Sequence, residues 1–273
     1  ATSGRTTLNG EGLQHQDCHS HILSSTIHNC ISYDPTYAYE VATIVKDGIK
    51  KMYIDQENYF YYITTINENY THPEMPKDCE EGIIKGMYVL SDNESYDIRL
   101  LGSGAILREA LKAKDILFKF KIKAQVWSVT SFNLLRKDGM EIERYNQLNP
   151  SGKQKLTYVE ECFSDSNVPV IAATDYMRSY AEQIRPYIHS SYTTLGTDGY
   201  GRSDSRQTLR DFFEVDSKSI ARAAIYALYK SDKIDKNQIE NYYKELGIDS
   251  NKPNPWEISV SYTHLTLPTT WCV

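Results

Sequence analysis

The feature that most constrains the fold is a repeated alternation of strand-forming and helix-forming segments along most of the chain. Short apolar runs rich in β-branched residues predict strands, and longer segments with apolar residues three and four positions apart predict helices. Alternation at this spacing is typical of βαβ units around a mostly parallel sheet, so an α/β fold is expected. The predicted strands are residues 96–101, 124–129, 168–172 and 192–195, and the predicted helices are residues 105–118, 176–187 and 217–230.

A similar unit is predicted nearer the start of the chain. Asp34 and Pro35 fit an N-cap followed by proline at the first helical position, so a helix is expected from there to about Tyr53. Its apolar residues fall on one stripe, which predicts a buried face. They are Tyr37, Val41, Ile44, Val45, Ile49 and Met52. The next run, residues 59–66, is apolar, aromatic or β-branched throughout, as in a parallel strand covered on both faces.

A chain of 273 residues is long enough for two domains of ordinary size. A loop follows the first unit at residues 67–77, and a second unit begins near Asp92. We therefore expect domains at residues 1–91 and 92–257. The last helix is predicted to be capped by Asp235 and closed by Gly247, so the globular fold should finish near Pro255.

Ligands bind to parallel sheets beyond the carboxyl ends of the strands. The loops at this edge are expected after Ile66, Leu101, Val129, Thr174 and Leu195. A Gly-Ser-Gly motif at residues 102–104 lies in one of them, but it lacks the third glycine or the lysine of phosphate-binding loops, so a plain turn is favoured.

The loop at residues 198–206 holds two aspartates, two arginines and two glycines. It fits either an anion site or a charge-paired loop, and we favour the second. Arg202 and Arg206 are expected to pair with the aspartates, and Ser205 is expected to cap the helix that follows.

Charge and cysteine content exclude several classes of protein. The net charge is −6 and the basic residues are scattered, so no nucleic-acid surface is expected. No apolar run approaches the roughly 20 residues of a membrane helix. The five cysteines form no CxxC pair and no disulfide framework, which favours a reducing cytoplasm.

One short segment is far denser in reactive side chains than the rest of the chain. It contains His15, Asp17, Cys18, His19 and His21. Imidazole titrates near neutral pH, so the segment could bind a metal, transfer protons or bind an anion. The spacing matches no known zinc pattern, so no metal ligands are assigned. An exposed loop without a role stays open, but contact with a substrate or cofactor is favoured because the segment leads into a predicted strand.

Seven blocks in a fixed order carry a resemblance to a known enzyme family. They are RTTLNGEGLQHQDCHSH, CISYDPTYAYEVATIV, YYITTINENYTHPEMP, LLGSGAIL, VWSVTSF, AATDYMRSYAEQIRPYI and LGTDGYGRSDSR. With these blocks the chain, from about Thr2 to Pro255, closely resembles pyruvate dehydrogenase, and more narrowly the homodimeric, thiamine-diphosphate-dependent first component of the bacterial complex.

The resemblance implies a C-terminal fragment. Residues 1–91 would be the end of the family's middle, pyrimidine-binding domain, and residues 92–257 its transketolase C-terminal-like domain. The implied activity is that of an oxidoreductase, which decarboxylates pyruvate on thiamine diphosphate with magnesium. It then acetylates the lipoyl group of dihydrolipoyl acetyltransferase, linking glycolysis to acetyl-CoA formation. The cofactor-binding and metal-binding motifs lie upstream in the family, so this chain alone is expected to be inactive.

The resemblance also implies that a histidine of the His-Ser-His segment lines the substrate channel. The wider transketolase pattern has an acidic residue, Asp and Gly, followed two residues later by His. It favours His21 as the catalytic residue and His19 as the second candidate. The expected role is a hydrogen bond to the substrate carboxylate or the developing enolate oxygen.

Three departures from the family pattern stand out. Cys18 replaces a glycine, which predicts a positive φ, a strained loop and a cost of about 1 kcal/mol, unless Cys18 is a sequencing error. His28 replaces a proline. Residues 258–273 look like a translated sequencing adapter, so we expect a non-native tail and assign no role to His264, Trp271 or Cys272.

Two other functions remain open. One is a transketolase-like enzyme acting on sugar phosphates, which requires phosphate-binding arginines that the sequence does not identify. The other is a non-catalytic binding or assembly module formed by the C-terminal domain alone.

Overall fold

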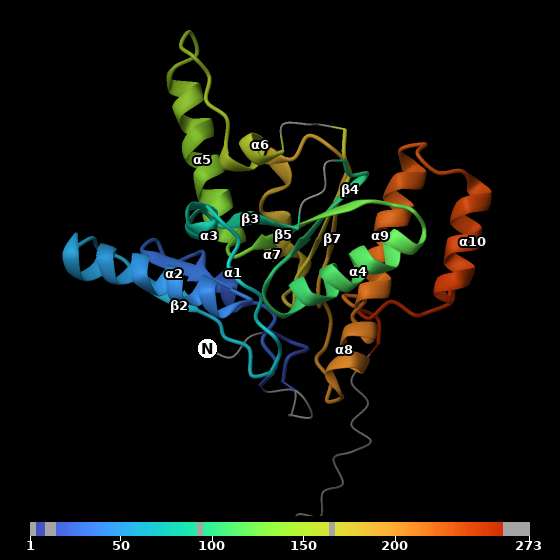
Figure 1. Cartoon of the computed structure of the whole chain (residues 1–273). Coiled ribbons are helices and arrows are strands. Elements are labelled where there is room, and N and C mark those ends of the chain that lie inside the picture. Colours follow the sequence, from blue (N-terminus) through green and yellow to red (C-terminus); the bar gives the residue numbers. More distant parts are fainter. Residues whose placement is uncertain (1–3, 9–14, 92–94, 164–166, 259–273) are drawn as a thin grey trace, which may run out of the picture.

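The computed structural model describes residues 4–8, 15–91, 95–163 and 167–258 (Figure 1). In this part of the chain the strands form a two-stranded and a five-stranded sheet, with orders β1-β2 and β3-β5-β4-β6-β7. All pairs are parallel except β3 with β5, so the expected mostly parallel α/β fold is confirmed. The strands are β1 Cys30–Tyr33, β2 Phe60–Ile63, β3 Met87–Ser91, β4 Ile98–Gly102, β5 Ala124–Val129, β6 Val170–Ala173 and β7 Tyr192–Leu195.

Helices lie before β1, between most successive strands and after β7. The α-helices are α1 Ser20–Ser24, α2 Ala38–Ile49, α3 Glu80–Lys85, α4 Leu107–Lys119, α5 Phe132–Leu148, α6 Tyr158–Cys162, α7 Arg178–Glu182, α8 Arg206–Phe212, α9 Ser217–Lys230 and α10 Lys236–Leu246. Short turns of other helical types are η2 Lys50–Ile54, η3 Gly104–Ile106 and η4 Arg185–Tyr187. None of the helices in the described ranges is long and apolar enough to cross a membrane.

The five-stranded sheet lies between two helical layers (Figure 1). On one face, Leu100 and Val126 pack with apolar residues of α4 and α9, and α10 packs outside α9. On the other face, Leu101 and Val129 pack with residues of α5, α6 and α7. Because successive strand residues point to opposite faces, each strand contributes to both layers, and all residues of β4, β5 and β6 are buried.

The predicted elements of this sheet agree with the structure to within a few residues. Strands β5 and β7 and helix α9 have the predicted bounds. Asp235 caps α10 by accepting the Gln238 N–H at 2.8 Å, and Gly247 ends the helix in the left-handed conformation, as expected. The predicted helix at residues 176–187 is instead two short helices, α7 and η4, because Pro186 has no N–H to continue the α-helical hydrogen bonds.

Helix α2 begins later than predicted, and Asp34 is not its N-cap. The Glu40 carboxylate accepts the Thr36 and Tyr37 N–H groups at 2.5 and 2.8 Å, so the first turn starts at Ala38. Asp34 is fully buried and bonds elsewhere.

The predicted buried stripe of α2 is only half right. Tyr37 and Ile44 are buried, but Val45 is 41% and Ile49 52% exposed. Strand β2 is likewise not covered on both faces, since Phe60 is 43% exposed. The β1-β2 sheet has too few strands to cover the whole apolar face of α2.

The longest element that was not predicted is α5, and β3 was not predicted either. Strand β3 is the antiparallel edge of the five-stranded sheet and precedes residue 92. Helix α5 follows β5 and contains Gly139, whose Cα lies against the ring of Tyr187. The domain boundary predicted at residue 91 stays a prediction. The predicted tail lies outside the described residues except for Ile258.

Candidate functional site

Polar residues lie directly after the parallel strands of both sheets. Asp34 follows β1, Thr64 follows β2, Ser103 follows β4, and Thr174 and Asp175 follow β6. All five are fully buried. The Gly104 N–H donates to the Asp34 carbonyl at 3.1 Å, and the Asp34 N–H donates to the Thr130 carbonyl at 2.7 Å, so the two sheets meet at their carboxyl ends. Within the five-stranded sheet, Ser103 bonds Thr174 at 3.0 Å. The predicted functional edge is therefore a buried polar cluster, which we call the strand-end cluster.

The dense histidine segment lies against this cluster. The Met177 N–H donates to the Cys18 carbonyl at 2.9 Å, which joins the segment to the loop after β6. Helix α1 starts where Asp17 accepts the N–H groups of His19 and Ser20, each at 3.0 Å. This first turn directs His21 inwards and leaves His19 exposed.

His21 is fully buried in an aromatic cage. Its ring stacks on Tyr180, with centroids 4.9 Å apart, and meets the edges of Tyr176 and Tyr62 at 4.6 and 5.4 Å. Burial lowers the pKa of His21 to about 3, because the cage offers no solvation for an imidazolium. The ring is therefore neutral at physiological pH.

The two ring nitrogens of His21 differ in their surroundings. Nε2 lies 3.2 Å from Thr64 Oγ1. Nδ1 is buried and has no hydrogen-bond partner among the described residues. Buried polar atoms without a partner are uncommon, so Nδ1 is a candidate contact for a ligand.

Two carboxyl groups of the strand-end cluster are fully buried. Thr64 Oγ1 lies 2.7 Å from Asp34 Oδ1, and burial raises the pKa of Asp34 to about 7 despite hydrogen bonds from Thr64 and Ser103. Burial also raises the pKa of Asp175, which accepts from Thr6 N–H at 3.0 Å and from the hydroxyls of Thr6 and Thr7 at 2.7 and 2.8 Å.

Cys18 does not have the positive φ that was predicted, so the expected strain is absent at this residue. Its thiol instead accepts from the Arg5 guanidinium and lies 3.0 Å from His19 Nδ1. Burial raises the pKa of Cys18, with Arg5 opposing the change. The side chain is thus accommodated by neighbours rather than by an unusual backbone.

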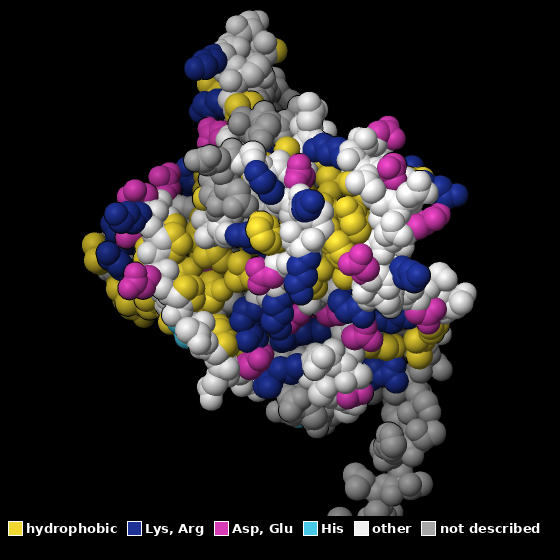
Figure 2. Space-filling view, turned by 45° about the vertical axis from the view of Figure 1, so that its right-hand side comes forward, with side chains coloured by type: hydrophobic (Ala, Val, Ile, Leu, Met, Phe, Trp, Pro, Cys, Tyr) yellow, Lys and Arg dark blue, Asp and Glu magenta, His cyan; other side chains and the backbone are white. Residues whose placement is uncertain are grey.

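The arginines nearest the strand-end cluster are paired with glutamates. Glu68 bonds Arg108 and lies 3.5 Å from Arg210 and 3.7 Å from Arg206, while Glu109 lies 3.4 Å from Arg210. Figure 2 shows basic side chains gathered across the middle of one face, with acidic ones among and around them. The three arginines therefore share two glutamates, which hold their guanidinium groups in place.

In the loop at residues 198–206 the contacts of the two arginines differ from the predicted pairs with aspartates. Arg206 donates to the Thr7 carbonyl at 2.7 Å and lies 3.7 Å from Glu68. Asp198 accepts the Arg178 N–H at 2.9 Å, and the Arg202 guanidinium lies 4.2 Å from the centre of the Phe212 ring. Ser205 caps α8 by accepting the Thr208 N–H at 3.3 Å, as predicted.

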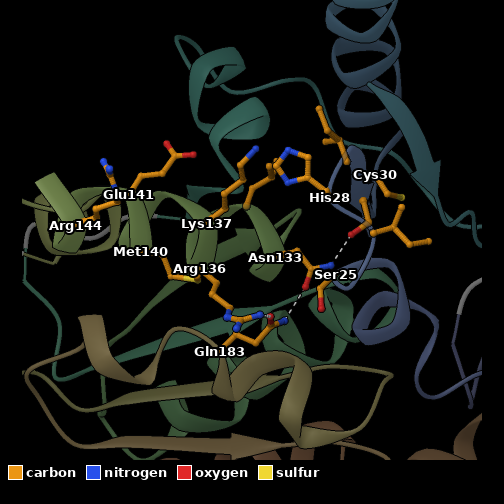
Figure 3. A pocket seen from close by; sticks show the side chains of 14 residues that line it. Ser25, His28, Cys30, Asn133, Arg136, Lys137, Met140, Glu141, Arg144 and Gln183 are labelled. Atoms are coloured by element: carbon orange, nitrogen blue, oxygen red, sulfur yellow. Dashed lines mark hydrogen bonds between the residues drawn. The ribbon is translucent and has the colours of Figure 1, made fainter. Parts of the chain in front are cut away.

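A cavity of about 450 Å³ lies beside the site, between the segment around β1 and helix α5 (Figure 3). Arg136, Lys137 and Arg144 of α5 line it, and so does His28. His21 does not line it. Asn133 joins the two places, because its side-chain amide lines the cavity and donates to the His21 carbonyl at 2.7 Å.

The sequence led us to propose His21, His19 and the strand-end loops, but not Asp34 and Thr64, which lie beside His21 in the structure. Asp34 was assigned to a helix cap, and Thr64 was placed inside a strand. A signal was present, since both are polar residues at the ends of apolar parallel strands. No group of three or more His, Cys, Asp or Glu residues in the described ranges could hold a metal ion.

Two family models match the chain. The pyruvate dehydrogenase E1 component middle domain matches residues 1–73, and the transketolase-like TK C-terminal domain matches residues 86–216.

Several curated relatives have the name pyruvate dehydrogenase E1 component. The protein from Pseudomonas aeruginosa is 54% identical over 259 residues, and that from Escherichia coli is 51% identical over 259 residues. The protein from Cupriavidus necator is 46% identical over 262 residues. These alignments cover 93%, 93% and 94% of this chain but only 29% of each relative.

Solved structures with a similar fold include transketolases. A mutant enzyme from Pichia stipitis gives a TM-score of 0.63 at 18% identity, covering 86% of this chain and 30% of that one. The enzyme from Campylobacter jejuni gives 0.61 at 15% identity, covering 82% and 30%. At these identities the likeness concerns the fold alone.

Proposed function

This chain belongs to the pyruvate dehydrogenase E1 component family, and on that premise we propose that it forms part of the site where such an enzyme decarboxylates pyruvate. The identity of 54% over 93% of the chain carries the proposal. The chain spans 29% of the length of these relatives, so the activity requires further polypeptide. We also propose that the acetyl group passes to the lipoyl domain of dihydrolipoyl acetyltransferase, and that the enzyme is a cytoplasmic homodimer.

Exposed apolar side chains support the need for further polypeptide. Val45, Ile49, Tyr53, Ile54 and Phe60 are 41 to 72% exposed and lie on α2, η2 and β2. Figure 2 shows hydrophobic side chains at the surface at the left edge of the molecule. Contiguous exposed apolar surface marks a place where another chain or domain packs.

Thiamine diphosphate and magnesium are implied by the family, but the described residues do not fit them on their own. The strand-end cluster presents Asp34 and Asp175, whose carboxyl groups would face an anionic diphosphate. The nearby arginines are engaged by Glu68 and Glu109. We therefore assign the binding of both groups to other parts of a longer enzyme.

Within that enzyme we propose that His21 contacts pyruvate and that His19 is the second candidate. The unpaired Nδ1 of His21 supports this role, because it is a polar atom free to bond an oxygen of the substrate. The low pKa of His21, about 3, means that it acts as a neutral hydrogen-bonding group. His19 is exposed and bonded to Cys18, so it is less constrained in position.

The test is a chimera in which residues 1–257 replace the aligned segment of the Pseudomonas aeruginosa relative. With thiamine diphosphate, magnesium and the lipoyl domain as acceptor, we expect carbon dioxide release from pyruvate in the chimera, and none from the chain alone. Release by the chain alone would contradict the need for further polypeptide. A folded chimera that acts on a sugar phosphate and ignores pyruvate would favour the transketolase-like alternative.

A further inference from the structure

His21, Thr64 and Asp34 form a continuous buried hydrogen-bonded row. Thr64 Oγ1 lies between the other two side chains, 3.2 Å from His21 Nε2 and 2.7 Å from Asp34 Oδ1. All three residues are fully buried. The hydroxyl is in the middle, unlike in a Ser-His-Asp triad where the imidazole is, so the row is not arranged to activate Thr64 as a nucleophile.

A hydroxyl has a single proton, so Thr64 donates in one direction at a time. The Tyr33 carbonyl is a weaker competitor, because it lies 3.3 Å from Thr64 Oγ1 and already accepts the Thr64 N–H at 3.1 Å. The Tyr176 hydroxyl also bonds Thr64 and accepts the Gly4 N–H at 3.1 Å, and burial keeps it neutral. Asp34 is the partner whose charge changes near neutral pH, so its protonation sets the direction of the Thr64 hydroxyl.

We propose that Asp34 acts through Thr64 as a positioning residue that selects the tautomer of His21, and so decides whether Nδ1 donates or accepts a hydrogen bond. With Asp34 ionised, Thr64 donates to its carboxylate and accepts from His21 Nε2–H, which leaves a lone pair on Nδ1. With Asp34 protonated, the acid donates to Thr64, Thr64 donates to Nε2, and the imidazole proton resides on Nδ1. One proton is taken from solvent in this change, and His21 is neutral in both states.

Asp34 changes its charge near neutral pH, since burial raises its pKa to about 7. Other titratable groups face the row. Those around His21 are Asp17, Tyr62, Tyr176 and Tyr180, and those around Asp34 are Glu40 and Asp175. Burial raises the pKa of all three tyrosines, which keeps them neutral. Glu40 is held by hydrogen bonds from Thr36, Tyr37, Tyr88 and Ser128.

This inference deepens the proposed function. A donor at Nδ1 suits a carboxylate or enolate oxygen of the substrate, whereas a lone pair there would repel it. The protonated form of Asp34 is accordingly the form that prepares His21 for an anionic substrate.

The tautomer can be measured directly by nitrogen-15 NMR of the 273-residue chain, without pyruvate or cofactor. We expect the His21 proton to move from Nδ1 to Nε2 as the pH rises from 5.5 to 8.5, with a midpoint near the Asp34 pKa of about 7. Thr64→Ser keeps the hydroxyl and should keep this change. Thr64→Val should abolish it, and so should Asp34→Asn, which serves if the valine variant does not fold.

A His21 tautomer that is constant with pH in the wild type, or a change that persists in the valine variant or in Asp34→Asn, would overturn the inference. So would conversion of His21 to imidazolium within this range. Each of these outcomes leaves the proposed function standing, because the chimera tests pyruvate turnover separately.

Discussion

Five strands of the chain lie between two helical layers, whereas the two strands nearer its start are only partly covered. Leu100 and Leu101 of β4 point to opposite faces and are both fully buried. In the first region Ile44 of α2 is fully buried, but Ile49 on the same predicted stripe is 52% exposed. An amphipathic stripe thus shows which side chains a helix can bury. These side chains are buried only where another element packs against them.

The strand-end cluster lies where these two regions meet. Asp34 and Thr64 come from the partly covered region, and Ser103 and Asp175 come from the five-stranded sheet. Because the cluster takes residues from both regions, it depends on the packing of each. Substitutions in each region therefore test how much that packing contributes to stability.

The largest effect is expected in the covered sheet. Leu100→Ala should lower the free energy of unfolding by about 2–5 kcal/mol, because it leaves a cavity between β4 and helices α4 and α9. Urea denaturation followed by circular dichroism measures it. A loss below about 1 kcal/mol would show that this sheet is less tightly packed than the structure describes.

A smaller, pH-dependent effect is expected at the junction. The folded chain holds the Asp34 proton more tightly than the unfolded chain, with a pKa of about 7 against 3.8, so stability from this group is present in acid and lost as the pH rises to about 7. Asp34→Asn removes the titrating carboxyl group and, with it, this loss of stability at higher pH. Relative to wild type, the variant should gain about 2–3 kcal/mol between pH 5 and pH 8.

Measurement of both proteins at each pH isolates this contribution, because His21 is common to both. The pKa of His21 is lowered, so its contribution has the opposite sign and is lost as the pH falls from 6.5 towards 3. Asp211→Asn, at an exposed carboxylate, is the matched control. A difference between Asp34→Asn and wild type that stays constant with pH would contradict the buried, proton-binding state of Asp34.

The smallest effect on stability is expected on the exposed apolar surface of the first region. Ile54 is 71% exposed, so Ile54→Ser should change the free energy of unfolding by less than about 0.5 kcal/mol. The same change should reduce self-association in sedimentation experiments, because it removes apolar surface. Destabilisation comparable to that of Leu100→Ala would mean that the region is covered within this chain.

The sequence was sufficient to predict much of the five-stranded sheet and its helices, because the patterns that define these elements are local. The bounds of β5 and α9 follow from periodicity, and those of α10 from the caps Asp235 and Gly247. Helix α5 is about as amphipathic as α9, and Ser131 caps it by accepting the Leu134 N–H at 3.1 Å, so local signals for this helix were present and were missed. Its Gly139, in contrast, is explained only by the close approach of Tyr187. That contact lies between residues far apart in the chain, so no local pattern reveals it.

The site was predicted in part for a similar reason. The density of histidines drew attention to His21, and the family resemblance ranked it above His19. Asp34 beside Pro35 has the local pattern of a helix cap, but the Glu40 carboxylate takes that role and leaves Asp34 to bond Thr64. Only the pairing of β1 with β2 brings Asp34 and Thr64 together.

The most direct measurement is the rate of carbon dioxide release from pyruvate by the chimera that contains residues 1–257, with the lipoyl domain of dihydrolipoyl acetyltransferase supplied as acceptor. His21→Asn should lower kcat by about 10²-fold or more, as expected for the loss of a positioned hydrogen-bonding group, while His189→Asn, at an exposed histidine, should leave it unchanged. A folded His21→Asn chimera with the full wild-type rate would contradict the assignment of this buried histidine to the site.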